Sequence, residues 1–318
     1  MTREVAHTFE EVVPLERDSY HVESTSFTRG LLDRGCTLPH CGRSMKRGLS
    51  FSLFASVGLA TLLALALALS VPAAGASPAV SGPKQHYLAL GDSLAFGFQP
   101  DGDLTHGYVP DLFAVLQGEG TKDVTNYGCG GESSATFING GCPGGHAGFV
   151  QLTAAVDFLQ AHPGKVSPVT LDIGANDILR DINPTTCTIN VSGFNADLAA
   201  LDANLTETIL PALRAALTVD GRVTGSIVMM NYYDPYQNTC PNTVPFVESL
   251  NQLLATDANG FAAIVDVFNA YGGPGVPNPG ICTLTWMCPA PPLRPNVHPT
   301  TEGYSVIADT FAAAIPPD

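Results

Sequence analysis

Basic side chains are scarce in this sequence. Its 318 residues include 14 Lys and Arg but 29 Asp and Glu, which gives a net charge of −15. A protein that binds nucleic acid or an anionic membrane surface needs a positive patch to face the phosphate groups. We therefore expect neither nucleic acid nor an anionic membrane as a partner.

Cysteine pairs of the kind that hold zinc are also missing. The sequence contains no Cys-x-x-Cys pair, the spacing that is typical of structural zinc sites, so we expect no metal. No internal repeat is visible, and the length that follows residue 76 suits a single α/β domain.

An export signal precedes that domain. Residues 43–47 are basic, residues 49–71 are almost wholly apolar, and residues 74–76 are Ala-Gly-Ala. This order is typical of a secretory signal peptide over residues 45–76, and it predicts a secreted, extracellular protein. Because the apolar run is long enough to span a bilayer, an uncleaved membrane anchor at 49–71 is the alternative.

Residues 1–44 are polar and do not belong to this pattern. A signal peptide normally begins near its methionine, so we expect Met45 to be the true start and residues 1–44 to be a mis-called or disordered extension. The alternative is a cytoplasmic tail on an anchored protein. After the leader, residues 77–85 are expected to be a Pro/Ser/Gly linker and residues 86–318 the folded domain.

Six cysteines follow the leader. An even number of cysteines in an exported chain is typical of disulfide bonds, although six cysteines can pair in many ways. We expect pairing in chain order, which joins Cys129 to Cys142, Cys187 to Cys240, and Cys282 to Cys288.

Short apolar runs alternate with helical patterns along the domain. The runs predict strands at 87–90, 123–127, 168–173, 222–230 and 262–267, and the patterns predict helices at 108–116, 149–160, 193–218, 244–254 and 299–314. The stretches 99–106 and 271–295 are expected to be irregular. Such alternation is typical of a mostly parallel sheet with helices on both faces, here a three-layer α/β/α domain with five strands.

The first strand leads directly to a candidate nucleophile. The apolar run Tyr87–Leu90 stops at Gly91, and Ser93 follows two residues later. This places a hydroxyl group at the carboxyl end of a strand, the edge at which open α/β sheets bind ligands. Asp92 beside it can accept backbone N–H groups and hold the turn. A serine alone is a weak nucleophile, so the chain must also supply a base.

Three later stretches can complete such a site. A glycine run that ends at Gly131 follows the second strand, where its N–H groups can approach a ligand; a flexible turn is the alternative. Asn176 follows the third strand and can donate an amide N–H into an oxyanion hole, or it can cap the next helix. His298 precedes the last helix and is a candidate base, although a lone histidine is more often structural.

Four motifs of this sequence resemble, in their order along the chain, those of the GDSL esterase/lipase family, the SGNH hydrolases. They are the Gly-Asp-Ser-Leu turn, the glycine loop, the Gly-x-Asn-Asp turn and the late His-Pro. The resemblance covers residues 86–314. It implies a flavodoxin-like α/β/α fold and ester hydrolysis through an acyl-enzyme, without a cofactor or metal. Ser93 is then the nucleophile and His298 the base. The backbone N–H groups of Ser93 and Gly131 and the side-chain amide of Asn176 are then the oxyanion hole.

The sequence departs from this family at one point. The family usually carries an acid three, or sometimes two, residues before the histidine, and here those positions are Pro295 and Asn296. A histidine base still needs an acceptor for its other ring N–H. We expect the backbone carbonyl of Pro295 to be that acceptor, with the side chain of Asn296 as the second candidate.

The cysteine pattern most resembles the family's secreted bacterial lipase/esterase branch, which implies a small-molecule or lipid ester as substrate. An aromatic loop at 231–236 is expected to line the substrate cleft. We expect a monomer. The alternatives are a carbohydrate acetylesterase and a catalytically silent binding protein on the same fold, which only the missing acid supports.

Overall fold

The computed structural model describes residues 79–317. The predicted extension at 1–44, the predicted signal peptide at 45–76 and the alternative anchor at 49–71 lie outside the described residues. Within residues 79–317, no helix is both long and apolar enough to cross a membrane.

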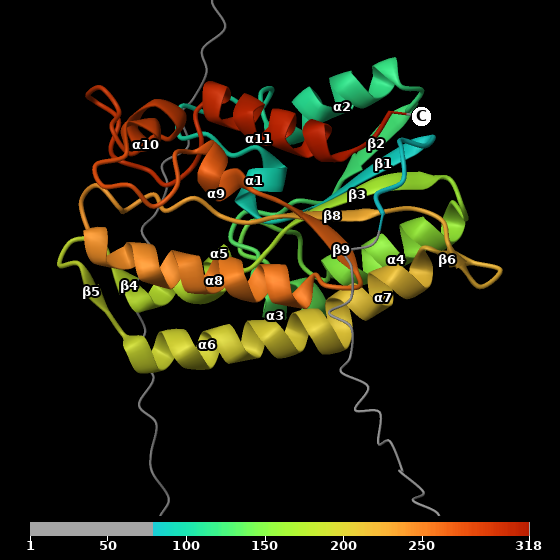
Figure 1. Cartoon of the computed structure of the whole chain (residues 1–318), viewed down its shortest axis with the longest axis horizontal. Helices are drawn as coiled ribbons and strands as arrows, with labels where there is room; N and C mark the ends of the chain where they lie inside the picture. Colours follow the sequence, from blue (N-terminus) through green and yellow to red (C-terminus); the bar gives the residue numbers. More distant parts are fainter. Residues whose placement is uncertain (1–78, 318) are drawn as a thin grey trace, which may run out of the picture. The chain divides into compact units, whose positions relative to one another are not determined.

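A five-stranded parallel sheet forms the centre of the domain (Figure 1). Its strand order is β2-β1-β3-β8-β9, and each pair of neighbours is parallel. The strands are β1 (His86–Gly91), β2 (Asp123–Asn126), β3 (Val166–Asp172), β8 (Ile227–Met230) and β9 (Ala262–Val265). Every residue of β3, the middle strand, is buried because helices cover both faces of the sheet. The predicted α/β/α fold with five parallel strands is confirmed.

The helices form one layer on each face of the sheet (Figure 1). α2 and α11 lie on one face, and α4, α6, α7 and α8 lie on the other. Their bounds are α2 (Tyr108–Gly118), α4 (Gln151–Ala161), α6 (Val191–Ala203), α7 (Leu210–Ala216), α8 (Val244–Asp257) and α11 (Thr301–Ala314). The rings of Tyr108 and Phe311 stack between α2 and α11 with their centroids 5.2 Å apart, so the two ends of the domain pack directly together.

The register of the sheet brings two turns together. Gly91 at the end of β1 lies opposite Asp172 at the end of β3. The turns that carry Ser93 and Asn176 therefore leave neighbouring strands at the same edge of the sheet. This carboxyl edge is where an open parallel sheet binds its ligands.

The predicted helix 193–218 is a continuous helix with one wide turn. A π-helical turn at Asn204–Ile209 joins α6 to α7. Pro211 in α7 has no N–H to offer the backbone carbonyl four residues earlier, and the hydrogen-bond pattern widens just before it. Leu205 and Leu213 are completely buried on the inner face of this helix, as the apolar spacing predicts.

The predicted strand 222–230 is wrong at its start. Only β8 joins the main sheet, whereas β7 (Arg222–Val223) pairs with β6 (Thr218–Val219) in a separate hairpin. The two residues between them, Asp220 and Gly221, have positive φ angles of 48° and 74°. An Asp-Gly pair in this conformation forms a tight hairpin turn, which apolar periodicity does not reveal.

Several short elements have no counterpart among the predictions. They are α1 (Ser93–Phe96), α3 (Ser134–Asn139), α5 (Ala175–Ile178), β4 (Ile182–Asn183), β5 (Thr188–Ile189), α9 (Val267–Ala270), α10 (Pro279–Leu284) and the 3₁₀ turns Leu179–Asp181 and Pro241–Thr243. Side-chain caps begin four of them, because Asp92 caps α1, Ser133 caps α3, Asp266 caps α9 and Asn278 caps α10. α10 lies inside a stretch predicted to be irregular. The last helix starts at Thr301 rather than at Pro299 because Thr300 caps it.

The structure pairs the six cysteines in chain order, the arrangement expected from the sequence. The bond between Cys187 and Cys240 spans 53 residues of sequence, against 13 and 6 for the other two. It joins the loop of the β4–β5 hairpin to the segment before α8, and Cys240 is completely buried.

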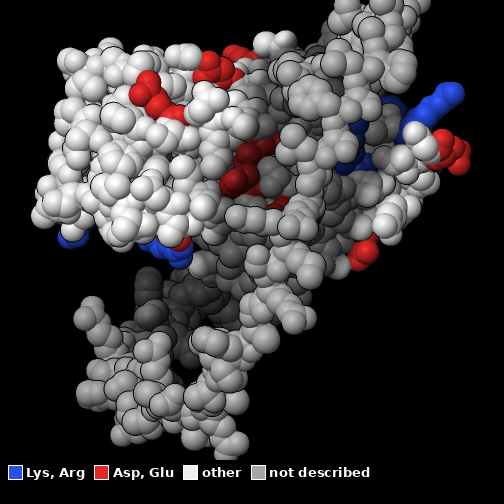
Figure 2. All heavy atoms as spheres, turned by 60° about the horizontal axis from the view of Figure 1, so that its bottom comes forward, with Lys and Arg blue, Asp and Glu red and all other residues white. Residues whose placement is uncertain are grey.

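The face of the domain drawn in Figure 2 carries few Lys and Arg side chains, and these do not form a continuous patch. This scarcity follows from the composition of the chain, in which acids outnumber bases 29 to 14. The expected absence of nucleic-acid partners stays a prediction.

Removal of the longest-range disulfide should lower stability most. In the chain-entropy view, a bond that closes a longer loop restricts the unfolded chain more. We expect the double variant Cys187→Ala/Cys240→Ala to lower the free energy of unfolding by about 4 kcal/mol and Cys282→Ala/Cys288→Ala by about 2 kcal/mol. Urea unfolding followed by fluorescence measures both, and equal losses or the reverse order would contradict this expectation.

Candidate active site

Ser93 begins a short helix immediately after β1. Its neighbour Asp92 caps this helix, because Asp92 Oδ1 accepts the backbone N–H of Leu94 at 2.8 Å. From β3, Asp172 Oδ2 accepts the backbone N–H groups of Asp92 at 3.0 Å and of Ala95 at 3.2 Å. Two buried carboxyl groups therefore hold the turn that presents the serine.

Gly91 allows this turn to lie close to β3. It has a φ angle of +142°, and a Cβ atom there would lie 2.4 Å from the Asp172 carbonyl oxygen and 2.5 Å from its carboxyl group. Gln151 holds the same residue from the other side. Its Oε1 accepts the Gly91 N–H at 2.6 Å, and its Nε2 donates to the Gly91 carbonyl at 3.0 Å. A side chain at position 91 would break this arrangement.

The two carboxyl groups under the turn receive tyrosine hydroxyls. Tyr108 donates to Asp172 Oδ1 at 2.5 Å, and Tyr232 donates to Asp92 Oδ2 at 3.1 Å. Burial raises the pKa of both acids, that of Asp172 well above its usual range. The pair therefore retains a proton at pH values where exposed acids are ionised, which limits negative charge beneath the serine.

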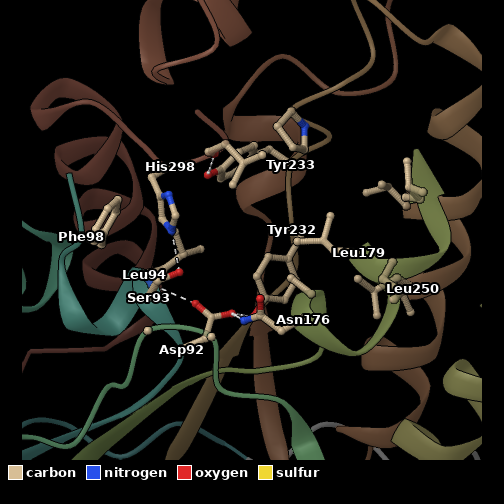
Figure 3. Close-up of a pocket in the computed structure, with 18 of the residues that line it drawn as sticks. Asp92, Ser93, Leu94, Phe98, Asn176, Leu179, Tyr232, Tyr233, Leu250 and His298 are labelled. Carbon is tan, nitrogen blue, oxygen red and sulfur yellow. Dashed lines mark hydrogen bonds between the residues drawn. The ribbon is translucent and has the colours of Figure 1, made fainter. Parts of the chain in front are cut away.

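His298 lies directly against Ser93. Its Nε2 is 2.7 Å from Ser93 Oγ, although the two residues are 205 positions apart in sequence. The backbone on either side of the histidine is fixed by Trp286, which donates its N–H to the His298 carbonyl at 2.9 Å and accepts the N–H of Asn296 at 2.7 Å. Figure 3 shows the imidazole above the serine at one end of the cavity.

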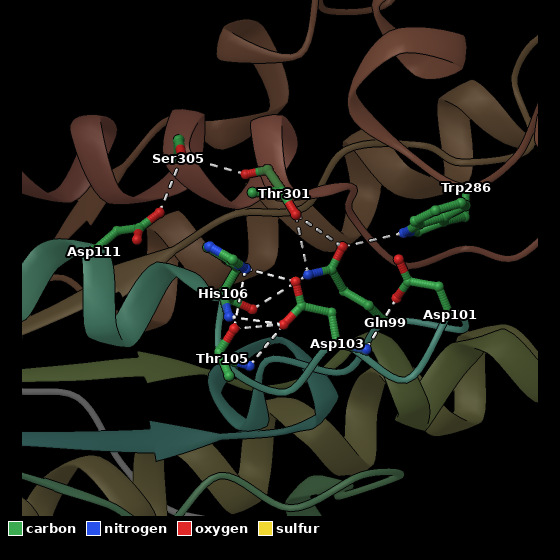
Figure 4. Close-up of polar contacts among 9 residues, drawn as sticks. All are labelled: Gln99, Asp101, Asp103, Thr105, His106, Asp111, Trp286, Thr301 and Ser305. Carbon is green, nitrogen blue, oxygen red and sulfur yellow. Dashed lines mark hydrogen bonds and ion pairs between the residues drawn. The ribbon is translucent and has the colours of Figure 1, made fainter.

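A polar loop braces this arrangement from outside (Figure 4). The buried side chain of Gln99 donates to the His106 carbonyl at 3.3 Å and accepts the indole N–H of Trp286 at 3.4 Å. The Thr301 hydroxyl, at the start of α11, also lies 3.4 Å from Gln99 Oε1. The stretch predicted as loop 99–106 thus links the two segments that flank His298.

The contacts of Asn296 fix the tautomer of His298. Asn296 Oδ1 accepts the backbone N–H of His298 at 3.1 Å, so the atom at that position is the amide oxygen. The same oxygen lies 2.5 Å from His298 Nδ1. An oxygen can only accept, so Nδ1 carries the proton, and Nε2 is free to accept the Ser93 hydroxyl proton.

The acceptor of the ring N–H differs from the one expected first. The Pro295 carbonyl is the acceptor expected from the sequence, whereas the structure places the Asn296 side chain at Nδ1. An asparagine readily folds its amide back onto the backbone two residues later, which brings it to the ring. No carboxylate bonds the ring within residues 79–317.

Burial lowers the pKa of His298 to about 4. Burial disfavours the charged imidazolium, and a neighbouring carboxylate would oppose this effect by favouring the positive charge. Asn296 is neutral and supplies only a dipole. The histidine is therefore unprotonated, and able to accept a proton, from mildly acidic pH upwards.

The candidate oxyanion groups lie around the same cavity as Ser93 and His298. Among residues 79–317, the backbone N–H groups of Ser93 and Gly131 donate to no other protein atom. Gly131 has a φ angle of +83°. Asn176 Nδ2 donates to the Glu132 carbonyl at 2.9 Å and lies 3.4 Å from Asp92 Oδ2. Asn176 does not cap α5, which Gly174 precedes.

The buried polar residues beneath the site, Glu132 and Gln151, were not predicted from the sequence. Glu132 follows the glycine run, and its Oε2 accepts from Gln151 Nε2 at 2.8 Å. Burial raises the pKa of Glu132. It lies near Cys129 and Cys142, but these sulfurs form a disulfide and offer no metal ligand. The one visible signal was Asp172, which is the only charged residue of β3 and stands at its end.

A model of the GDSL-like lipase/acylhydrolase family matches residues 89–306. The chain belongs to this family. A search of curated protein sequences returns no match.

A solved structure shares the fold of this GDSL hydrolase, and two others are similar to it at lower scores. A lipase from a goat rumen metagenome superposes with a TM-score of 0.51 at 14% identity, covering 72% of this chain and 96% of its own. An acetylxylan esterase from Geobacillus stearothermophilus gives a TM-score of 0.45 at 18% identity, with 76% and 98% covered. Phospholipase A1 from Streptomyces albidoflavus gives a TM-score of 0.47 at 17% identity, with 73% of this chain and 99% of the phospholipase chain covered.

A methyl group at position 91 should disrupt the turn that carries Ser93. We expect Gly91→Ala to lower the free energy of unfolding by about 3 kcal/mol, because it combines a positive φ angle with overlap against Asp172. Gly118→Ala is the matched control, since nothing lies within 4 Å of its Cβ position at the end of α2. Chemical denaturation measures both, and equal effects would show that the close approach is unimportant.

Proposed function

We propose that this GDSL hydrolase is a secreted serine esterase that uses Ser93 as nucleophile and His298 as base. The observation that carries the proposal is the 2.7 Å contact between His298 Nε2 and Ser93 Oγ, together with the contacts that put the ring proton on Nδ1. A nucleophile needs an unprotonated base within hydrogen-bond reach, and this geometry supplies one.

The reaction has two halves. Ser93 Oγ attacks the ester carbonyl carbon while His298 Nε2 takes the hydroxyl proton. The negative charge that develops on the carbonyl oxygen faces the N–H groups of Ser93 and Gly131 and the amide of Asn176. The bond to the alkoxide then breaks, and His298 returns the proton to the departing alcohol. Water repeats the sequence on the acyl-enzyme, which releases the acid and restores the serine.

The neutral acceptor of His298 gives the site its own pH dependence. During each half-reaction the ring becomes an imidazolium, and here an amide oxygen stabilises that charge where a triad would use a carboxylate. The ring still keeps the correct tautomer and orientation. Catalysis by a dyad of this kind supports activity at lower pH, because the base stays unprotonated until the pH approaches its lowered pKa.

Secretion is part of the proposal. Three disulfide bonds within the described residues are typical of an oxidising compartment, in agreement with the export signal expected over residues 45–76. The alternative of a catalytically silent binding protein is weakened by the serine–histidine contact, since a silent fold has no need to hold the two side chains together.

Loss of the nucleophile should abolish ester hydrolysis. We expect Ser93→Ala to lower kcat/KM for p-nitrophenyl esters at least ~10³-fold without a change in thermal stability larger than a few degrees. Ser192→Ala, an exposed serine at the start of α6, is the matched control and should hydrolyse esters at the wild-type rate. Turnover by Ser93→Ala within a few-fold of wild type would exclude Ser93 as the nucleophile.

A carboxylate at position 296 should move the pH profile. The base must be unprotonated, so kcat/KM falls as the pH drops through its pKa, which is about 4 in the native protein. In Asn296→Asp the new negative charge favours the imidazolium, and we expect the acid limb to move up toward pH ~6.

An Asn-to-Asp substitution far from the site is the control for this shift of the acid limb. Asn259→Asp lies on an exposed turn after α8 and should leave the acid limb in place. An acid limb that stays near pH 4 in Asn296→Asp, or that moves equally in Asn259→Asp, would contradict a direct contact between residue 296 and the base.

A further inference from the structure

The cavity beside the serine is large and predominantly apolar. It has a volume of about 510 Å³. Ile178 and Leu179 line it from the segment after Asn176, and Val247 and Leu250 line it from α8. A cavity of this size holds far more than an acetyl group, and its walls favour a ligand that gains by leaving water.

Two of the three tyrosines that line the cavity, Tyr232 and Tyr233, do not offer their hydroxyl groups to a ligand. The hydroxyl of Tyr232 donates to Asp92 Oδ2 at 3.1 Å, and that of Tyr233 donates to the Val297 carbonyl at 2.7 Å. The ring of Tyr233 also stacks on Tyr271 with centroids 4.4 Å apart. These side chains are fixed, so they present carbon to the cavity.

Charged groups are equally unavailable. Asp234 is completely buried, and its carboxyl group accepts the Thr243 hydroxyl at 2.6 Å and the Tyr236 N–H at 2.9 Å. Among the described residues, no Lys or Arg lines the cavity. A sugar would therefore find few partners to replace its hydrogen bonds to water, and a phosphate would find no cation.

The direction of the cavity identifies which half of the ester it receives. The leaving alcohol must lie beside His298, because that residue returns the proton to it. The cavity extends the other way, past Asn176 to Leu179 and Leu250 (Figure 3). The part of the substrate that remains attached to Ser93 is the part that points there.

From this arrangement we infer that the cavity binds the acyl chain, and that the substrates are neutral esters of medium- to long-chain aliphatic acids. The inference rests on the proposed function of Ser93 and His298. It separates this chain from esterases that remove acetyl groups from carbohydrates and from enzymes that grip an anionic headgroup. The alcohol half of the substrate contributes little to recognition.

Two series of esters test this assignment with the full-length secreted protein. We expect kcat/KM for p-nitrophenyl esters to rise at least about tenfold from acetate to octanoate, because each methylene buried in the cavity adds apolar contact. A series of acetates with lengthening alcohols should change kcat/KM by less than about threefold. The highest kcat/KM for the acetate, or dependence on alcohol length instead of acyl length, would overturn the inference.

Substitutions of Leu179, on the cavity wall far from Ser93, test where the acyl chain of the substrate lies. We expect Leu179→Trp, which fills the cavity, to lower the octanoate-to-acetate ratio of kcat/KM about tenfold. Leu179→Asn keeps the size of the side chain, introduces a polar group and should lower the same ratio, so the test survives if the tryptophan variant misfolds. Leu104→Trp and Leu104→Asn are matched controls, because Leu104 is 63% exposed on a loop outside the cavity. An unchanged ratio in both folded Leu179 variants would overturn the inference.

Labelling with a phosphonate probe for reactive serines distinguishes a failure of the acyl-chain assignment from a failure of the proposed function. Labelling that is lost in Ser93→Ala, combined with a preference for acetate, leaves the serine esterase intact and overturns only the acyl-chain assignment. Absence of both labelling and turnover overturns the proposed function and the acyl-chain assignment together.

Discussion

The carboxyl group of Asp172 is the constraint on which the site depends. It stands at the end of the central strand and accepts the backbone N–H groups of Asp92 and Ala95, so it ties the turn after β1 to β3. Tyr108 donates to its other oxygen from the helix layer above. One buried group thereby connects two strands and a helix, and Gly91 is required because the backbone must pass so close to it. The proposed nucleophile is positioned by an acid that takes no part in the proposed reaction.

A local contact, rather than a bond between strands, holds the histidine. Its partner Asn296 belongs to the same short turn, and one amide oxygen meets both the backbone N–H and the ring N–H of His298. A single local contact therefore sets the rotamer and the tautomer together. A carboxylate would add charge stabilisation of the imidazolium, but a buried, unpaired carboxylate is itself expensive to keep ionised. The neutral acceptor avoids that desolvation cost and leaves the histidine with a low pKa.

Much of the fold was predictable because burial leaves a periodic pattern. The five strands and the long helices follow from apolar spacing, and the strand ends placed Ser93 and Asn176 at one edge of the sheet. The resemblance to the GDSL family added His298 to them. Hydrogen bonds to side chains leave no such pattern. Periodicity could not decide between the Pro295 carbonyl and the Asn296 amide as partner of the ring, because both lie within reach and a rotamer decides. Short capped helices and the hairpin before β8 were missed because local turns, and not burial, determine them.

The separation of the two central side chains in sequence has a consequence for folding. Ser93 follows the first strand and His298 precedes the last helix, 205 positions later, and the chain between them supplies most of the sheet. Their contact is therefore among the most non-local in the domain, and such contacts carry a large loop-closure entropy and form slowly. The serine and histidine meet only when both ends of the chain have docked. Recovery of ester turnover during refolding thus reports completion of the whole domain, after secondary structure has formed.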